Sequence, residues 1–130
     1  MQAAGLSHLA QVWRIRETPD GLGDPLDRVF DTQPTPDGLF CWSDIHAIEV
    51  LNRAHERGIK VPDQLAVVGY DNTPAAQMPL IGLTSLEQHG TVLGRQAAEV
   101  LLTRIKGRTK AEHLLIQPDL VRRRSTRSSD

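Results

Sequence analysis

The sequence predicts an α/β fold with a parallel sheet, and three consecutive segments carry that prediction. Residues 39–42 and 65–70 are continuous apolar runs, typical of strands that are buried on both faces. Between them, residues 44–57 repeat apolar side chains at helical spacing, which predicts an amphipathic helix. Two such strands joined by one helix form a right-handed βαβ unit, so we expect the strands to be parallel.

The helix over 44–57 has a clear beginning and end in the sequence. Ser43 is a residue type that caps helix N-termini, and Gly58 is suited to the left-handed residue that closes a helix. We expect one apolar stripe along this helix, made by Ile45, Ile48, Leu51 and Ala54.

The first 30 residues contain weaker signals. Gly5 is suited to close a helix that ends over residues 1–4, and residues 11–17 alternate enough to predict a short strand. Asp24, followed by a proline, predicts the start of a short helix over 25–30. Prolines and glycines then predict a loop up to the first apolar run.

The second half of the chain predicts further α/β elements. Residues 73–81 form a proline-containing loop, residues 83–86 are of β type, and residues 90–105 form a helix that Gly107 ends. One face of this helix carries Leu93, Ala97, Leu101 and Ile105.

The C-terminal residues predict one more strand and a polar tail. Residues 113–116 can form a short strand, and the ending VRRRSTRSSD is polar enough to predict a mobile tail. Its basic cluster of Arg122, Arg123, Arg124 and Arg127 could touch phosphate, but a solvated tail is the commoner reason for such a run.

Composition narrows the class of protein. The chain has 130 residues, 39% hydrophobic and 24% charged, with a net charge of −1, which fits one globular domain and not a nucleic-acid-coating protein. The single cysteine, Cys41, excludes an internal disulfide, so we expect the cytoplasm. No apolar run is long enough for a membrane span.

Catalytic and metal signatures are absent from the sequence. It contains no G-x-S-x-G, P-loop, H-E-x-x-H or G-x-G-x-x-G motif, so we expect no enzyme activity and no cofactor. Its five histidines are scattered without metal-ligand spacing and are most simply surface residues: His8, His46, His55, His89 and His113.

Polar residues follow both apolar strands at the edge where parallel sheets bind ligands. Trp42 and Ser43 follow the first strand, and Asp71 and Asn72 follow the second. The polar groups match vicinal hydroxyls and the indole offers a flat face, so a sugar-like ligand is predicted. Ser43 is equally well explained as a helix cap, and Trp42 as a core residue.

Asp71 is the hardest of these residues to explain without a ligand. A carboxylate placed directly after an apolar strand is costly unless it meets solvent, a partner or a ligand. Asp44, in contrast, stands at the start of a helix, where the dipole favours an acidic residue without any further role.

Three stretches of the chain resemble the lactose/galactose repressor (LacI/GalR) family. The first is LFCWSDIHAIEVLNRAHERGIKVPDQLAVVGYDN, which resembles part of that family's sensor domain. The second, LTSLEQHGTVLGRQAAEVLLTRIKG, resembles its crossing strand and following helix, and LLIQPDLVRRRST resembles its C-terminal ending. Together the matching residues run from Pro36 to Thr126.

The resemblance implies a periplasmic-binding-protein-like fold, of which residues 1–126 would form the C-terminal part and residues 127–130 a disordered tail. It implies a homodimer that binds a small-molecule effector, such as a sugar, and reaches operator DNA through a helix-turn-helix headpiece that we do not find in these 130 residues. In the full-length regulator, effector binding would change operator affinity by rearranging the dimer.

The resemblance also assigns roles to residues. Asp71 matches the family aspartate that hydrogen-bonds effector hydroxyls, and Ser43 stands where an Asn or Ser often lines the pocket. Trp42 departs from the small residue common at its position, and Ile81-Gly82 replaces a frequent Pro-Pro. The implied dimer surface comprises Ile45, Ile48, Glu49, Asn52, Thr73, Pro74 and Met78.

Two other functions compete with an effector-binding regulator domain. One is part of a sugar-binding protein of an ABC-type transport system, against which the LVRRRST ending and the lack of an export signal argue. The other is an independent small α/β protein, and folding tests this reading. We expect the isolated chain to aggregate or to be partly unfolded, because its βαβ faces lack partner elements.

Overall fold

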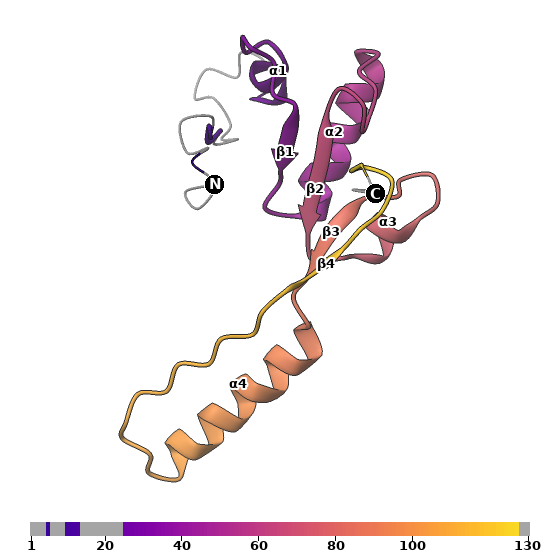
Figure 1. The fold of residues 1–130 in the computed structure, drawn as a ribbon. Helices are drawn as coiled ribbons and strands as arrows, with labels where there is room; N and C mark the ends of the chain where they lie inside the picture. The colour runs from indigo at the N-terminus through magenta and orange to yellow at the C-terminus, as the bar shows by residue number, and fades with distance from the viewer. Residues whose placement is uncertain (1–4, 6–9, 14–24, 128–130) are drawn as a thin grey trace. The chain divides into compact units, whose positions relative to one another are not determined.

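The computed structural model describes residues 5, 10–13 and 25–127 of the chain (Figure 1). The chain divides into two compact units, residues 1–36 and residues 37–130. Within the first unit, α1 (Pro25–Phe30) confirms the predicted helix and buries Leu26, Val29 and Phe30.

Only part of the other N-terminal predictions falls on described residues. Gly5 has a φ of 68°, which is the left-handed conformation expected of it, whereas the helix end proposed over 1–4 lies outside the described residues. Residues 11–13 are not in a strand, and the rest of the strand predicted over 11–17 lies outside, as does Asp24.

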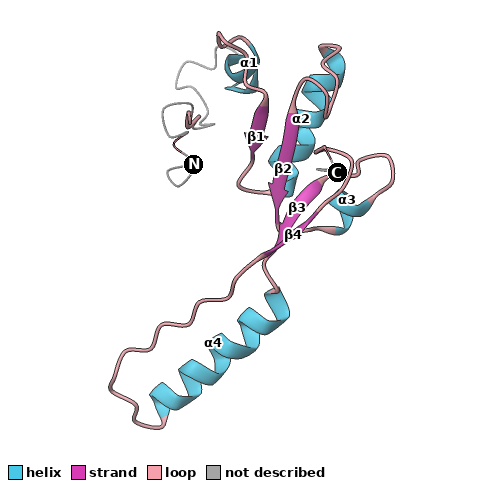
Figure 2. Ribbon diagram, viewed as in Figure 1, coloured by secondary structure: helices cyan, strands magenta, loops and turns pink. Residues whose placement is uncertain are grey.

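The second unit contains a four-stranded sheet in the order β1-β2-β3-β4 (Figure 2). Its strands are β1 (Gly38–Phe40), β2 (Ala66–Tyr70), β3 (Thr84–Glu87) and β4 (Asp119–Val121). The first three strands are parallel, and β4 is antiparallel to β3. Since α2 (Asp44–Glu56) joins β1 to β2, the predicted parallel βαβ unit is confirmed.

Small residues form the buried face of α2, and of the predicted apolar stripe only Ala54 belongs to it. Ala47, Val50 and Ala54 are buried, whereas Ile45 is 67% exposed. The reason lies in β2, because a Cβ atom on Gly69 would lie 3.3 Å from the Cβ of Ala47. The helix therefore approaches the sheet closely at a glycine, and its larger residues Ile45, Ile48 and Leu51 lie beside this face.

The first strand differs from the prediction in its burial. β1 is the edge strand of the sheet, its residues alternate between exposed and half-buried, and Phe40 is 62% exposed. Trp42, just beyond it, is 71% exposed, so the core interpretation of Trp42 is wrong. An apolar run indicates that burying the strand is favourable, but it does not indicate which element covers the strand.

The long helix α4 (Gly90–Ile105) has the predicted bounds but no buried residue. Its predicted apolar face is largely uncovered, with Leu101 59% and Ile105 72% exposed. No helix among the described segments has the length and apolar character that crossing a bilayer requires.

The strand predicted over residues 113–116 is not present. These residues form an extended segment in which Leu115 is 98% exposed, and the last strand is β4 instead. An extended segment becomes a strand only beside a neighbour, and β4 finds one in β3. The predicted loop over 73–81 contains one turn of helix, α3 (Pro74–Gln77), capped by Thr73.

The C-terminal arm, residues 122–127, is packed against the sheet, so the prediction of a mobile tail is wrong for these residues. Ser125 is 1% exposed, and its hydroxyl donates to the Val67 carbonyl at 2.6 Å and accepts from the Thr84 amide at 2.8 Å. The Val67 amide donates to the Ser125 carbonyl at 2.9 Å. Small polar side chains pack well when strand amides and carbonyls supply their partners. Residues 128–130 lie outside the described part.

The arginines of the arm also bond to the fold. The guanidinium of Arg123 donates to the Leu83 carbonyl, that of Arg124 to the Ile81 carbonyl and that of Arg127 to the Asp63 carbonyl. The interpretation of this basic cluster as a merely solvated run is therefore wrong for these three residues.

Candidate functional site

The polar residues predicted to form a site lie at the carboxyl ends of parallel strands. Trp42 and Ser43 follow β1, and Asp71 follows β2. Gln88 and His89 follow β3, which is parallel to β2 and therefore ends at the same edge. Loops from three strands thus contribute to one edge of the sheet, the usual place for a ligand in an open α/β fold.

Asp71 is half-buried and has an unusual backbone. Its φ is 103°, a backbone conformation that residues other than glycine rarely adopt. Its amide donates to the Leu86 carbonyl at 2.9 Å. Its Oδ1 accepts a 2.8 Å hydrogen bond from Nε2 of Gln88. Strain of this kind is often held at functional positions, where the surrounding structure fixes a side chain.

Gln88 belongs to this edge as well, although its residue type alone does not single it out. The signal was available, because the β-type stretch over 83–86 precedes it just as apolar strands precede Ser43 and Asp71. The local sequence does not show the direction of this third strand. In the structure it is parallel to β2 and antiparallel to β4.

Ser43 is the N-cap of α2, as one of its two interpretations predicted. Its side-chain oxygen accepts from the His46 amide at 3.5 Å and lies 2.7 Å from Nδ1 of the same histidine. The ring of His46 in turn lies 4.8 Å from that of Trp42, tilted by 37°. These three residues form one cluster at the start of α2, although sequence analysis had treated His46 as a surface residue.

The remaining histidines divide into two kinds. His55 and His113 are exposed, as expected, and His8 lies outside the described residues. His89 is half-buried and its Nε2 lies 3.0 Å from Oδ2 of Asp119, so the surface interpretation is incomplete for it. This contact joins the residues that follow β3 to the start of β4.

Asp44 is more than a residue favoured by the helix dipole. It is fully buried, and its Oδ2 accepts from the Thr73 amide at 2.6 Å and from the Thr73 hydroxyl at 2.9 Å. Its Oδ1 accepts from the Ser85 hydroxyl at 2.5 Å. These bonds tie the start of α2 to the loop after β2 and to β3, so Asp44 builds the edge on which Asp71 stands.

Asn72 uses both ends of its side chain. Its Nδ2 donates to Oε2 of Glu87 at 3.0 Å, and its Oδ1 accepts from Nη2 of Arg123 at 2.6 Å. The hydrogen bond from Asn72, followed by one from the His89 amide, lowers the pKa of Glu87 below its ordinary value. Glu87 is therefore held as a carboxylate at neutral pH.

The edge presents carboxylate, hydroxyl, amide and ring groups. Within the described residues, no hydrogen bond links Ser43 to Asp71. Such a set can accept from and donate to hydroxyl groups, and the exposed indole of Trp42 can lie against a sugar ring. Within the described residues, no group of three or more His, Cys, Asp or Glu side chains is arranged to hold a metal ion.

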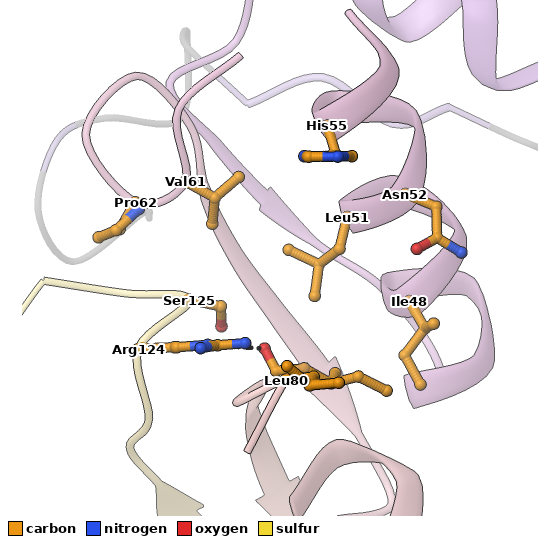
Figure 3. A pocket seen from close by; sticks show the side chains of 10 residues that line it. Ile48, Leu51, Asn52, His55, Val61, Pro62, Leu80, Arg124 and Ser125 are labelled. Atoms are coloured by element: carbon orange, nitrogen blue, oxygen red, sulfur yellow. Dashed lines mark hydrogen bonds between the residues drawn. The ribbon is translucent and has the colours of Figure 1, made fainter. Parts of the chain in front are cut away.

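A groove of about 530 Å³ lies away from this edge, beside α2 (Figure 3). We call it the α2 groove, and it is lined by Ile48, Leu51, Asn52, His55, Val61, Pro62, Leu80, Ile81, Arg124 and Ser125. Two of the residues expected at a dimer surface, Ile48 and Asn52, therefore line it. Leu80 is 91% exposed. The cavity thus marks a surface different from the strand ends that carry Asp71.

The other residues expected at a dimer surface have different surroundings. Met78 is 55% exposed, as Ile45 is at 67%, while Glu49 and Pro74 are exposed. Thr73 is half-buried and bonded to Asp44, which gives it a structural role as the cap of α3.

Comparison with known proteins places this fold in a family. The model of the periplasmic-binding-protein-like domain matches residues 1–126. The HTH-type transcriptional repressor PurR of Vibrio parahaemolyticus is 33% identical over 102 residues, which cover 78% of this chain and 30% of that protein. The PurR of Haemophilus influenzae is 32% identical over 116 residues, covering 86% and 34%. The chain spans about a third of the length of these curated relatives.

Solved structures agree with the sequence relatives. A LacI transcriptional regulator from a Rhodococcus species is 30% identical with a TM-score of 0.72, and covers 78% of this chain and 38% of that one. The transcriptional regulator CelR in complex with cellobiose is 31% identical with a TM-score of 0.72, covering 78% and 31%. The chain therefore belongs to the periplasmic-binding-protein-like domain family, in the form found as the sensor domain of LacI-type regulators.

Proposed function

We propose that this chain is an effector-binding and dimer-forming part of a cytoplasmic LacI-family transcription regulator. The effector is a carbohydrate or a related small metabolite, bound through Asp71, Ser43 and Trp42. In the full-length regulator, operator DNA is contacted by a helix-turn-helix headpiece, and effector binding changes operator affinity through the dimer.

The observation that carries this proposal is the placement of Asp71. Its carboxylate follows a parallel strand, its φ of 103° is held by neighbouring bonds, and Gln88 orients one of its oxygens. A half-buried carboxylate at this edge is well suited to accept hydrogen bonds from vicinal hydroxyls. The CelR structure contains cellobiose. A periplasmic binding protein/LacI transcriptional regulator from Alkaliphilus metalliredigens, 29% identical with a TM-score of 0.58, is complexed with D-xylulofuranose. Both support the same ligand class.

Dimer formation is supported by the surface beside α2. The groove there is partly apolar, and the exposed side chains of Ile45 and Met78 extend the apolar area. Contiguous exposed apolar surface of this kind commonly marks an interface.

Asp71→Ala is the substitution that tests the effector site. The full-length regulator with the unsubstituted sequence should gain thermal stability with cellobiose or D-xylulose, by about 2.7 kcal/mol when the sugar is at a hundred times its Kd. Asp71→Ala should lose this gain, because the hydroxyls lose their acceptor. Differential scanning fluorimetry with each sugar measures the shift in melting temperature of both proteins.

Asp63→Ala provides the matched control, because Asp63 is an exposed acid in the turn before β2. It should keep the full sugar-induced stabilisation. If Asp71→Ala keeps it as well, Asp71 is not part of the effector site.

A further inference from the structure

The side chain of Asn72 attaches the loop that carries Asp71 to the C-terminal arm. Its Oδ1 accepts from Nη2 of Arg123 at 2.6 Å, while its Nδ2 donates to Glu87 at 3.0 Å. The same guanidinium donates through Nη1 to the Leu83 carbonyl at 2.7 Å. Asn72 therefore joins the end of β2, the end of β3 and the arm.

The backbone of Asn72 is fixed as firmly as its side chain. Its amide donates to the Ser85 hydroxyl at 3.0 Å, and its carbonyl accepts from Nε2 of Gln77 at 3.2 Å. Its φ is 48°, in the left-handed region that asparagine and aspartate adopt more readily than other side chains. A residue held at four points moves together with its partners and not alone.

The arm leads directly from this contact to the α2 groove. Arg123 bonds to Asn72, and the next two residues, Arg124 and Ser125, line the groove (Figure 3). We propose that Asn72 is a positioning residue that couples the Asp71 loop to the α2 groove through Arg123. The inference rests on the proposed function, in which Asp71 contacts the effector and the groove belongs to the dimer surface.

A reversal of donor and acceptor tests this coupling without removing any side chain. Asn72→Asp puts a carboxylate against Glu87 and should break that bond by repulsion. In the double variant Asn72→Asp with Glu87→Gln, the new glutamine amide donates to the new aspartate. The glutamine oxygen still accepts from His89, and the aspartate still accepts from Arg123, so every bond is restored with no change in net charge from the unsubstituted chain.

NMR of the full-length regulator that contains this chain gives the readout. In Asn72→Asp the pKa of Glu87 should rise. Repulsion from Glu87 should also displace the new carboxylate and, with it, the guanidinium of Arg123 to which it stays bonded, so the amide signals of Asp71, Arg124 and Ser125 should all shift. The double variant should return the three amide signals toward their original positions. If the unsubstituted regulator binds cellobiose, affinity should fall about tenfold in Asn72→Asp, as expected for one lost hydrogen bond, and recover in the double variant.

The ligand-free signals separate this inference from the proposed function, since chemical shifts respond even if no sugar binds. Unmoved Arg124 and Ser125 signals in Asn72→Asp would overturn the coupling, as would a double variant that restores nothing. If Asn72→Asp does not fold, Arg123→Lys replaces it. Lysine keeps the charge, but it lacks the guanidinium that donates to both the Leu83 carbonyl and Asn72. An unshifted Asp71 amide in that variant also overturns the coupling.

Discussion

Burial and a neighbouring charge together lower the reactivity of the Cys41 thiol. Burial, followed by the negative charge of Glu49, raises the pKa of the thiol from 9.0 to about 11. Both effects act in the same direction, because each disfavours the thiolate. The thiolate is the species that reacts with thiol reagents, so this cysteine should be slow to modify.

At pH 8 the thiolate fraction of Cys41 is about 100-fold lower than that of a thiol with a pKa of 9.0. Because a thiolate of higher pKa is also more nucleophilic, we expect its reaction with iodoacetamide to be slower by about tenfold or more. The rate should keep rising with pH up to about 11. Mass spectrometry of alkylated protein at several pH values measures it. Glu49→Gln should move the pH profile down only partly, since burial is the larger cause, and rapid alkylation of the unsubstituted chain at pH 8 would contradict the raised pKa.

Residue types identified candidate groups but not their partners. Asp71 and Ser43 stand out in the sequence because they follow apolar strands, and both lie at the expected edge. The roles of Asn72 and Arg123 depend on a contact between residues 51 positions apart, which local sequence does not encode. Asp44 was undervalued for the same reason, since its donors come from two later segments.

At the level of elements, substitution by alanine should have opposite effects on stability at two glycines, because their surroundings differ. A Cβ atom on Gly69 in β2 would collide with Oδ1 of Asp44 and lie 2.9 Å from Cδ2 of Leu83. A Cβ atom on Gly94 in α4 would meet nothing within 4 Å. Gly69 therefore permits α2 to pack on the sheet, whereas Gly94 only weakens its own helix.

Gly69→Ala should lower the free energy of unfolding by about 1–3 kcal/mol, as overpacking in a core does. Gly94→Ala should instead raise the helix content of α4, with a local gain of about 1 kcal/mol. Chemical denaturation of the full-length regulator measures the first effect, and far-UV circular dichroism measures the second. A Gly69→Ala chain as stable as its parent would mean that α2 does not approach β2 at this residue.

Elements defined by their own periodicity were the most predictable. The bounds of α4 follow from apolar spacing and the closing glycine, and α2 agrees within one residue at its end. The errors concern what lies next to an element. Neither the exposure of β1 nor the absence of a strand over 113–116 can be read from residues whose neighbours are distant in sequence.

At the scale of the whole molecule, the described residues leave much apolar surface uncovered. The large side chains more than half exposed in the second unit include Phe40, Trp42, Ile45, Met78, Leu80, Leu101, Leu102, Ile105 and Leu115. Many lie on α4 or in the segment after it. Surface of this extent promotes association unless another element or chain covers it.

We therefore expect purified chain 1–130 to aggregate or to melt without a sharp transition. Light scattering after size-exclusion chromatography, together with a thermal melt followed by circular dichroism, measures both properties. Added sulfate should worsen aggregation, because it strengthens the association of apolar surfaces. A monomer with a cooperative, sharp melting transition would show that the exposed apolar surface does not limit the fold.

The position of Ser125 has a consequence for the order of events during synthesis. In the described part of the chain, the amides of Val67 and Thr84 donate to Ser125, which is 58 residues beyond Val67 and 41 beyond Thr84. A ribosome releases the chain from its N-terminus, so β2 and β3 leave the exit tunnel well before the residue that completes their hydrogen bonds. These hydrogen bonds can form only after residue 125 has left the tunnel, and a stop codon at or before position 125 would leave two buried strand amides without acceptors.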